Sequence, residues 1–252
     1  MTFNLPFVRS RLPSHRVEWF PSIDSTMMVA SQLARKGHGQ GAIVVADEQT
    51  AGMGRQGRSW HSPAGEGLYV SLVLAAKPAP ILMLALGLAT QEVIREALAM
   101  VARPPLVDIR WPNDILLQPE HDVEYKCAGI LAQVERDSVI AGIGINVSQQ
   151  HFPPDLDTPG ISLALAGVDM RREELLVELV ESIDYYAGLS TAQVTAKFLE
   201  SSSYAHGKRV QTEAGGRKIE GVTNGLDPSG FLRIKLDDGT ERTILAGGVR
   251  PV

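Results

Sequence analysis

Residues 48–67, EQTAGMGRQGRSWHSPAGEG, combine the side chains that an anion-binding loop needs. Glycines let main-chain N–H groups approach a phosphate closely, and Arg55 and Arg58 would neutralise its charge. Trp60 adds a flat aromatic face suited to a purine. The segment indicates a loop that orders over an anion made during a reaction, although a solvated surface loop can have the same composition.

Two nucleotide-binding motifs match this loop, but the residues around them do not form the structure that either motif needs. Residues 52–57 read G-x-G-x-x-G, but a dinucleotide-binding turn needs a helix directly after it and an acidic residue about 20 positions on. Pro63 and Gly65 prevent that helix, and residues 71–73 are Ser-Leu-Val. A phosphate-cradling P-loop needs the same helix, and lysine where Arg58 stands. Neither fold is therefore predicted.

The loop and the strand after it, GMGRQGRSWHSPAGEGLYVSL, resemble the G-R-G-R-x-G-R-x-W…S-P…G-x-x-L-Y-x-S signature of biotin protein ligases. Met53 stands where the family usually has arginine, at a position that acts largely through its backbone. Other family motifs follow the same order along the chain: D-S-T at 24–26, R-W-P-N-D at 110–114 with Arg110 for the usual lysine, K-C-A-G-I-L at 126–131 and G-I-G-I-N at 142–146. Each of these is weak alone, whereas the ordered set is specific.

The resemblance implies a biotin pocket. In the family, the D-S-T motif holds the ureido ring, a glutamine matching Gln49 lies near biotin, and the glycine matching Gly129 leaves room for its rings. The residues expected to bind biotin are Ser25, Thr26, Met27, Gln49, Gly52, Met53, Gly54, Arg55, Lys126, Gly129 and Gly142. Taken alone, D-S-T equally suits a helix N-cap, and a G-x-G in a strand marks only close packing.

The resemblance also implies an adenylate site. The lysine matching Lys126 contacts the biotin carboxylate and the α-phosphate in the family. The residues expected to bind ATP or the adenylate are Arg55, Arg58, Trp60, Asn113, Asp114 and Asn146. Asp114 is also the candidate ligand for Mg²⁺, which favours oxygen atoms. A tight turn explains Asn113 and Asp114 equally well, and a lysine at a strand edge is usually only solvated.

The implied activity is that of a ligase. Biotin and ATP would form biotinyl-5'-AMP, and the biotin would then pass to a lysine of a biotin carboxyl carrier protein, a subunit of acetyl-CoA carboxylase. Because two anions must meet in the first step, Lys126, Arg55 and Arg58 are the expected catalytic residues, with Mg²⁺ as cofactor. A lipoate ligase is disfavoured by the glycine loop and the β-rich tail. A catalytically inactive binding protein is disfavoured because every charged residue that the family's reaction needs is present in this sequence.

The elements around these residues predict an α+β fold with a mixed or antiparallel central sheet and flanking helices, resembling a class II synthetase-like catalytic domain. The first sixteen residues show no periodicity and predict a loose lead-in. Strands are expected at 17–20, 42–46, 68–74, 107–111, 115–117, 128–135 and 139–146. Helices are expected over 27–37, 80–101, 171–188 and 191–203.

Residues 207–252 change character, since short alternating runs there are separated by Gly and Asp turns. Asp237-Asp238-Gly239 is a strong hairpin signal. The family has a small SH3-like β-barrel at this end. We therefore expect a catalytic domain over 1–204 and an SH3-like domain over 205–252.

Composition excludes several other classes. The formal net charge of −5 argues against a DNA-binding protein, and a ligase that is also a repressor would need roughly 60 further N-terminal residues. Cys127 is the only cysteine, so no internal disulfide can form. There is no secretory signal and no apolar run long enough to cross a bilayer. We expect a cytoplasmic protein without DNA or membrane partners. A homodimer formed edge to edge is one option by analogy with the family.

Overall fold

The computed structural model of the chain describes residues 3–37, 39–75, 79–119, 123–214 and 217–252. These residues include a seven-stranded sheet with the order β1-β2-β3-β7-β6-β5-β4. Its strands are β1 Arg16–Phe20, β2 Ala42–Ala46, β3 Gly67–Ala75, β4 Leu106–Arg110, β5 Asp114–Gln118, β6 Tyr125–Glu135 and β7 Ser138–Asn146. β1 and β2 are parallel, and the other neighbours are antiparallel. This mixed sheet, with its β4–β7 meander, confirms the expected fold class.

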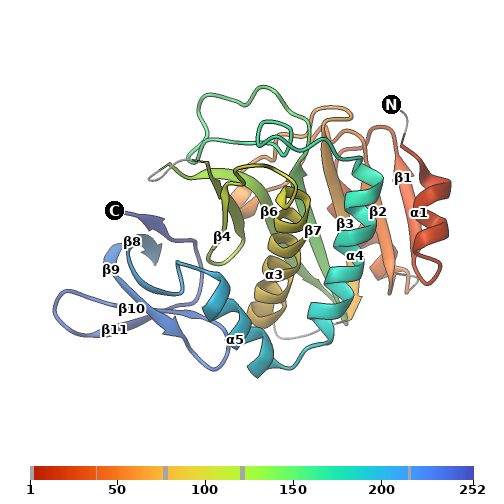
Figure 1. The fold of residues 1–252 in the computed structure, drawn as a ribbon. Helices are drawn as coiled ribbons and strands as arrows, with labels where there is room; N and C mark the ends of the chain where they lie inside the picture. Colours follow the sequence, from red (N-terminus) through yellow and green to blue (C-terminus); the bar gives the residue numbers. More distant parts are fainter. Residues whose placement is uncertain (1–2, 38, 76–78, 120–122, 215–216) are drawn as a thin grey trace.

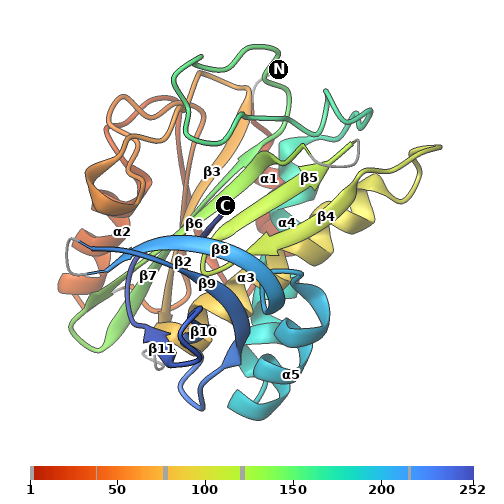
Figure 2. The same ribbon diagram turned by 90° about the vertical axis from the view of Figure 1, so that its left-hand side faces the viewer.

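Helices cover both faces of this sheet (Figures 1 and 2). α1 Leu5–Arg11, α3 Ala79–Leu98 and α4 Arg172–Gly188 pack on one face, and α2 Thr26–Arg35 packs on the other. Side chains alternate between the faces along each strand. In β2, Ile43 and Val45 enter the main core, while Ala42 and Val44 pack beneath α2. Burial on both faces explains why this strand is entirely apolar.

The predicted loose lead-in is wrong, because residues Leu5–Arg11 form α1. The side chain of Asn4 accepts a hydrogen bond from the Phe7 amide and caps the helix. Val8 is completely buried, and Phe3 and Leu12 join the main core. A seven-residue helix is too short to be stable alone, so tertiary burial stabilises it.

After α5 Thr191–Ser201, the chain enters a second, five-stranded antiparallel sheet with the order β11-β10-β9-β8-β12. Its strands are β8 His206–Ala214, β9 Arg217–Leu226, β10 Leu232–Lys235, β11 Glu241–Ile244 and β12 Arg250–Pro251. The predicted hairpin at 237–239 joins β10 to β11, with Gly239 at φ +85°. β12 brings the C-terminal residues to the end of β4, where the Val249 amide donates to the Trp111 carbonyl.

Within the described residues, no helix has both the length and the apolar character needed to span a bilayer.

Candidate active site

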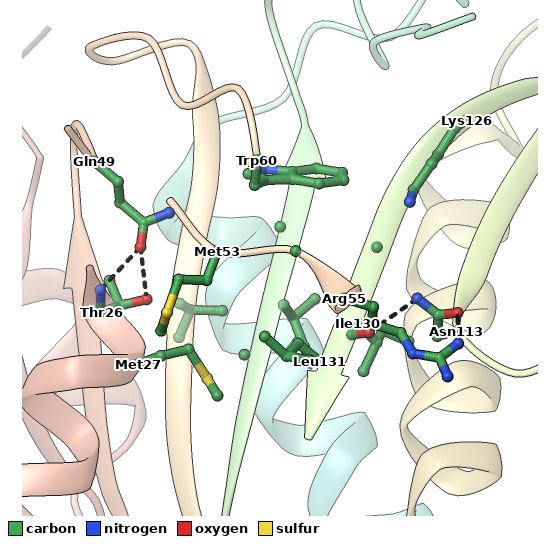
Figure 3. A pocket seen from close by; sticks show the side chains of 16 residues that line it. Thr26, Met27, Gln49, Met53, Arg55, Trp60, Asn113, Lys126, Ile130 and Leu131 are labelled. Atoms are coloured by element: carbon green, nitrogen blue, oxygen red, sulfur yellow. Dashed lines mark hydrogen bonds between the residues drawn. The ribbon is translucent and has the colours of Figure 1, made fainter. Parts of the chain in front are cut away.

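Two cavities meet at the end of the central sheet. We call the first the inner pocket; it is a partly enclosed hollow beneath the glycine loop. It is lined by Thr26, Met27, Gln49, Met53, Gly54, Arg55, Trp60, Val70, Asn113, Lys126, Gly129, Ile130, Leu131, Gly142, Ile143 and Gly144 (Figure 3). All the residues predicted to bind biotin line it except Ser25 and Gly52. The second cavity, the outer groove, is lined by all six residues predicted to bind ATP or the adenylate, and by residues of the second sheet.

The floor of the inner pocket is bare backbone. Alternation along β7 turns Gly142 and Gly144 toward the pocket, while Ile143 and Ile145 point into the core. A Cβ atom at Gly142 would lie 2.5 Å from the sulfur of Met27, and one at Gly144 would meet the Trp60 ring. A side chain at Gly144 would have to displace the Trp60 ring, whereas one at Gly142 would only have to displace the flexible end of Met27.

The D-S-T segment forms one polar end of the inner pocket. The amide and hydroxyl of Thr26 both donate to Oε1 of Gln49, at 2.9 and 3.1 Å. The Thr26 hydroxyl also lies 2.8 Å from that of Ser71, a lone polar residue in a strand that is otherwise apolar at its centre. Ser71 was not among the predicted residues, although this isolated hydroxyl was a visible signal.

Ser25 occupies the N-cap position of α2, but its side chain makes no capping hydrogen bond. Its Oγ atom is buried and has no hydrogen-bond partner among the described residues. Because a buried hydroxyl without a partner is costly, the simple N-cap interpretation does not explain this serine. Ser25 stays a predicted biotin residue that lies just behind the pocket wall.

A β-bulge aims Lys126 into the site. Asp114 pairs with Gly129 and Ile115 with Ala128, but Leu116 pairs with Lys126, so Cys127 is an extra residue in β6. The extra residue reverses the alternation and brings Lys126 to the same face as Gly129. A Cβ atom at Gly129 would lie 3.2 Å from the Lys126 Nζ atom. Without the bulge, the two side chains would point to opposite faces.

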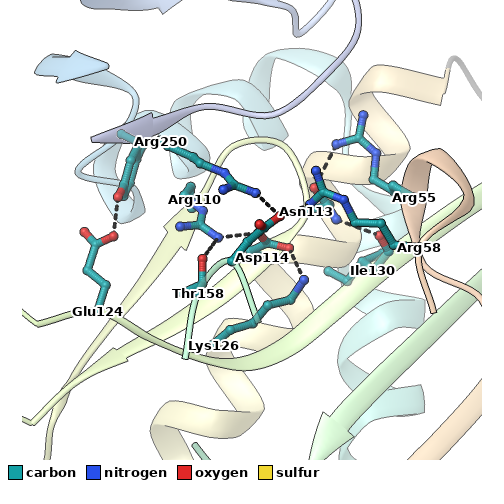
Figure 4. Close-up of polar contacts among 12 residues, drawn as sticks. Arg55, Arg58, Arg110, Asn113, Asp114, Glu124, Lys126, Ile130, Thr158 and Arg250 are labelled. Atoms are coloured by element: carbon teal, nitrogen blue, oxygen red, sulfur yellow. Dashed lines mark hydrogen bonds and ion pairs between the residues drawn. The ribbon is translucent and has the colours of Figure 1, made fainter. Parts of the chain in front are cut away.

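Asp114 holds the two cations that flank it (Figure 4). Its Oδ1 atom lies 2.7 Å from the ammonium of Lys126, and its Oδ2 atom lies 2.8 Å from the guanidinium of Arg110. Burial alone would raise the pKa of Asp114, but these two cations outweigh it and hold the pKa below its ordinary value. Arg110 itself is 6% exposed, and it also donates to the Thr158 hydroxyl. Asp114 is therefore a charged anchor for Lys126.

This geometry does not fit Asp114 as a magnesium ligand. Each of its oxygens already faces a cation, so a metal ion at Oδ1 would displace the Lys126 ammonium and one at Oδ2 would displace the buried Arg110. The described residues also contain no group of three or more His, Cys, Asp or Glu side chains that could hold a metal ion.

The amides of Asn113 and Asn146 connect the strands around Lys126. Asn113 donates to the Ile130 carbonyl and accepts from Arg55 at 2.8 Å. Asn146 donates to the carbonyls of Lys126 and Ile161, both at 3.1 Å. Their predicted contacts with a nucleotide stay predictions, since the bonds seen here hold backbone carbonyls and the Arg55 guanidinium.

The glycine loop folds back over the inner pocket as a small hairpin. The amide of Gly54 donates to the Arg58 carbonyl, and that of Trp60 donates to the Gly52 carbonyl. Gln56 and Gly57, at φ 56° and 75°, form the turn between them. A Cβ atom at Gly52 would lie 2.6 Å from the Trp60 carbonyl oxygen, so the two backbone segments pack directly together. Met53 projects toward Met27 at the pocket (Figure 3).

Trp60 lies across the sheet at the boundary between pocket and groove. Its ring fills the space above Gly129 and Gly144, and the Lys126 ammonium lies 5.2 Å from the ring centroid. Its Nε1 atom is buried and has no hydrogen-bond partner in the part of the chain that the structure describes. The indole therefore forms one wall of both cavities.

The two loop arginines take different directions. Arg55 points inward to Asn113, and burial lowers the pKa of its guanidinium although Asp114 is nearby. Arg58 points outward and pairs with Asp157 at 2.9 Å. Arg250 of β12 binds the same Asp157 carboxylate and holds its pKa below the ordinary value. Asp157 and Arg250 carry no local sequence signal, and only tertiary contacts bring them to the site.

The inner pocket has apolar walls, and at Lys126 it opens into the outer groove, which is lined by several cations. A carboxylate in the pocket could therefore meet a polyphosphate in the groove. This arrangement is typical of enzymes that activate carboxylic acids with ATP. The model of the Biotin/lipoate A/B protein ligase family matches residues 19–150, and that of the Biotin protein ligase C terminal domain matches residues 205–249. The chain belongs to the biotin protein ligase family.

Individual relatives agree with this assignment. The Bifunctional ligase/repressor BirA of Bacillus subtilis is 33% identical over 237 residues, which cover 87% of this chain and 69% of that protein. The Biotin--[acetyl-CoA-carboxylase] ligase of Mycobacterium tuberculosis is 33% identical over 232 residues, covering 87% and 83%. The biotin protein ligase from Aquifex aeolicus in complex with biotin and ATP has a TM-score of 0.77 and 30% identity, covering 93% of this chain and 97% of that chain.

Proposed function

We propose that this protein joins biotin to ATP as biotinyl-5'-AMP and then transfers the biotinyl group to a lysine of a carrier protein. The observation that carries the proposal is the position of Lys126. Its ammonium lies where the inner pocket, which suits an uncharged ring system, meets the outer groove, which suits phosphates. An acid bound in the pocket would therefore present its carboxylate beside a nucleotide in the groove.

In the first step, a biotin carboxylate oxygen attacks the α-phosphorus of ATP, and the bond to pyrophosphate breaks. Both reactants are anions, so their repulsion must be offset. Lys126 supplies a positive charge where they meet, and its pairing with Asp114 keeps that charge in place. Arg55 and Arg58 add positive charge from the glycine loop, and Mg²⁺ would enter with the phosphates.

In the second step, the ε-amine of the carrier lysine attacks the anhydride carbonyl carbon, AMP leaves with the former carboxylate oxygen, and the amine loses a proton. Water would destroy the adenylate before this step. The glycine loop and Trp60 lie over the reacting end of the pocket, where they can exclude solvent. Cys127 is not needed as a nucleophile, and burial raises the pKa of its thiol to about 12.

Several finer assignments belong to the same proposal. The carrier is the biotin carboxyl carrier protein of an acetyl-CoA carboxylase, and the protein works in the cytoplasm. The catalytic domain spans 1–204 and the SH3-like domain spans 205–252, since the second sheet starts at β8. A homodimer formed by edge pairing would use β1 or β4, the strands at the ends of the large sheet.

Mass spectrometry of a carrier domain tests the proposal directly. Incubation with the enzyme, ATP and biotin should add one biotinyl group to the carrier, and replacing biotin by lipoate should add nothing. A carrier that gains lipoate but not biotin would refute the assignment. Biotin binding without any transfer would instead identify a binding protein.

A further inference from the structure

Asp157 is the point where two arginines from distant parts of the chain meet. Its Oδ2 atom pairs with Arg58 of the glycine loop and with Arg250 of β12. One carboxylate oxygen thus bridges two guanidinium groups. A phosphate oxygen can bind a pair of arginines in the same way, because guanidinium N–H groups donate charge-assisted hydrogen bonds to both anions.

Backbone contacts fix Asp157 beside the reacting end of the inner pocket. The Lys126 amide donates to the Pro159 carbonyl at 2.7 Å, and the Ile161 amide donates back to the Lys126 carbonyl at 3.1 Å. Arg110 holds the Thr158 hydroxyl. The residues that follow Asp157 therefore run alongside Lys126, and Asp157 lines the outer groove with it.

The Asp157 ion pairs are exposed, unlike those of Asp114. The side chains of Asp157 and Arg58 are 50% and 59% exposed, whereas that of Asp114 is 15% exposed. Exposed ion pairs are weak because water screens them. A ligand with several negative charges can therefore displace the Asp157 carboxylate, while Asp114 keeps its partners.

We propose that Asp157 is a positioning residue for the polyphosphate of the nucleotide. It holds Arg58 and Arg250 together until phosphate oxygens replace its carboxylate, which then turns to solvent. No covalent bond changes in this exchange. Because Arg250 lies in the second sheet, the bound polyphosphate would join that sheet to the glycine loop. The inference rests on the proposed function, since it assigns the groove to a nucleotide.

A carboxylate that competes with phosphate and one that merely ties two loops together predict opposite results. Asp157→Asn keeps the shape of the side chain but removes its charge. If Asp157 competes, the variant should bind polyphosphate more tightly. If it only ties the loops, the variant should bind polyphosphate more weakly, because the arginines lose their position.

Calorimetric titration with inorganic tripolyphosphate at fixed ionic strength separates these cases. We expect Asp157→Asn to bind about three- to tenfold more tightly than the wild type, as the loss of two weak competing ion pairs would give. The matched control is Asp155→Asn, which removes the same charge from the same loop. Asp155 forms no ion pair among the described residues, so its loss should change the affinity less than about twofold. Unchanged or weaker binding in Asp157→Asn would overturn the exchange.

Arg250→Gln provides the second arm of the test. It should weaken tripolyphosphate binding. When Asp157→Asn is combined with Arg250→Gln, the gain in tripolyphosphate affinity should be smaller than in the wild type, because the two residues are coupled. In the full reaction, Asp157→Asn should lower the KM for ATP by a similar factor and leave the KM for biotin unchanged.

The titration contains no biotin, so its result does not depend on whether the protein biotinylates a carrier. If the carrier is never biotinylated but the tripolyphosphate affinity responds as expected, the exchange stands and the function is wrong. If the carrier is biotinylated but the affinity does not respond, the exchange is wrong.

Discussion

The inner pocket and the outer groove are adjacent, yet the fold builds them in different ways. The pocket is formed by β6, β7 and the start of α2, together with residues of the glycine loop that packs against these strands. The groove is bounded by loops and by the second sheet, and ion pairs hold its charged residues in place.

This difference matches two kinds of recognition. Rigid walls select one ligand by shape, so a change of a single methyl group should be felt in the pocket. Movable charges select a class of ligand by its negative charge, so single substitutions in the groove should have graded effects. Lys126 belongs to both cavities, and its loss should have the largest effect.

Lys126→Ala should lower the rate of biotin adenylation by about a hundred- to a thousandfold, because one positioned charge at a developing anion commonly contributes that much. Biotin-dependent pyrophosphate exchange measures the effect, and circular dichroism checks the fold. Lys235→Ala, which removes an exposed lysine on β10, is the control. Full pyrophosphate-exchange activity in Lys126→Ala would show that the chemistry does not occur at Lys126, where the inner pocket meets the outer groove.

Asp114→Asn should destabilise the fold by about 3 kcal/mol at neutral pH, because it leaves the buried guanidinium of Arg110 without its counter-charge. The lowered pKa of Asp114 means that its ion pairs add stability above the ordinary carboxyl pKa of about 4. That contribution is lost as the pH falls through the lower folded-state pKa. Urea unfolding should therefore show a difference in the free energy of unfolding between the wild type and the variant that becomes smaller as the pH falls. If this difference does not depend on pH, the lost charge is not its cause.

Gly144→Ala should weaken biotin binding about tenfold, since its methyl group would displace the rigid Trp60 ring into the pocket. Calorimetry with biotin measures this affinity. Gly188→Ala is the matched control, because a Cβ atom there meets nothing within 4 Å. If both variants bind biotin equally well, the pocket is not rigid at this strand.

Arg55→Gly should have the smallest effect on adenylation, a reduction of severalfold, because Lys126 and Arg58 remain. The effect of this substitution on retention of the bound adenylate should be larger. Losing the Arg55–Asn113 hydrogen bond frees the loop, so the adenylate should escape and label lysines of bystander proteins. A streptavidin blot with added serum albumin detects this labelling. Strict carrier specificity in the variant would argue against a retention role for the loop.

Local patterns predicted much of the fold. β2 matches its expected bounds, 42–46, because five consecutive apolar residues suit a strand buried on both faces. Helix α1 was missed, since its stability comes from burying Val8 rather than from its own residues. The inner-pocket residues could largely be predicted, because they lie in contiguous motifs. Asp157 and Arg250 could not be placed, since their partners are far away in sequence, whereas the single hydroxyl of Ser71 in an apolar strand was a usable signal.

The sequence alone determined the family, the glycine positions and which cations are available to the site, because motif order and residue type are properties of the chain itself. The tertiary structure decided where those cations point. One extra residue in β6 turns Lys126 to the pocket face, and Asp114 then holds it there. Arg58 reaches Arg250 only through Asp157, because the chain leading into β12 returns to the end of β4 and brings the two arginines together. Strand register and long-range charge pairing depend on the whole fold, so no local pattern contains them.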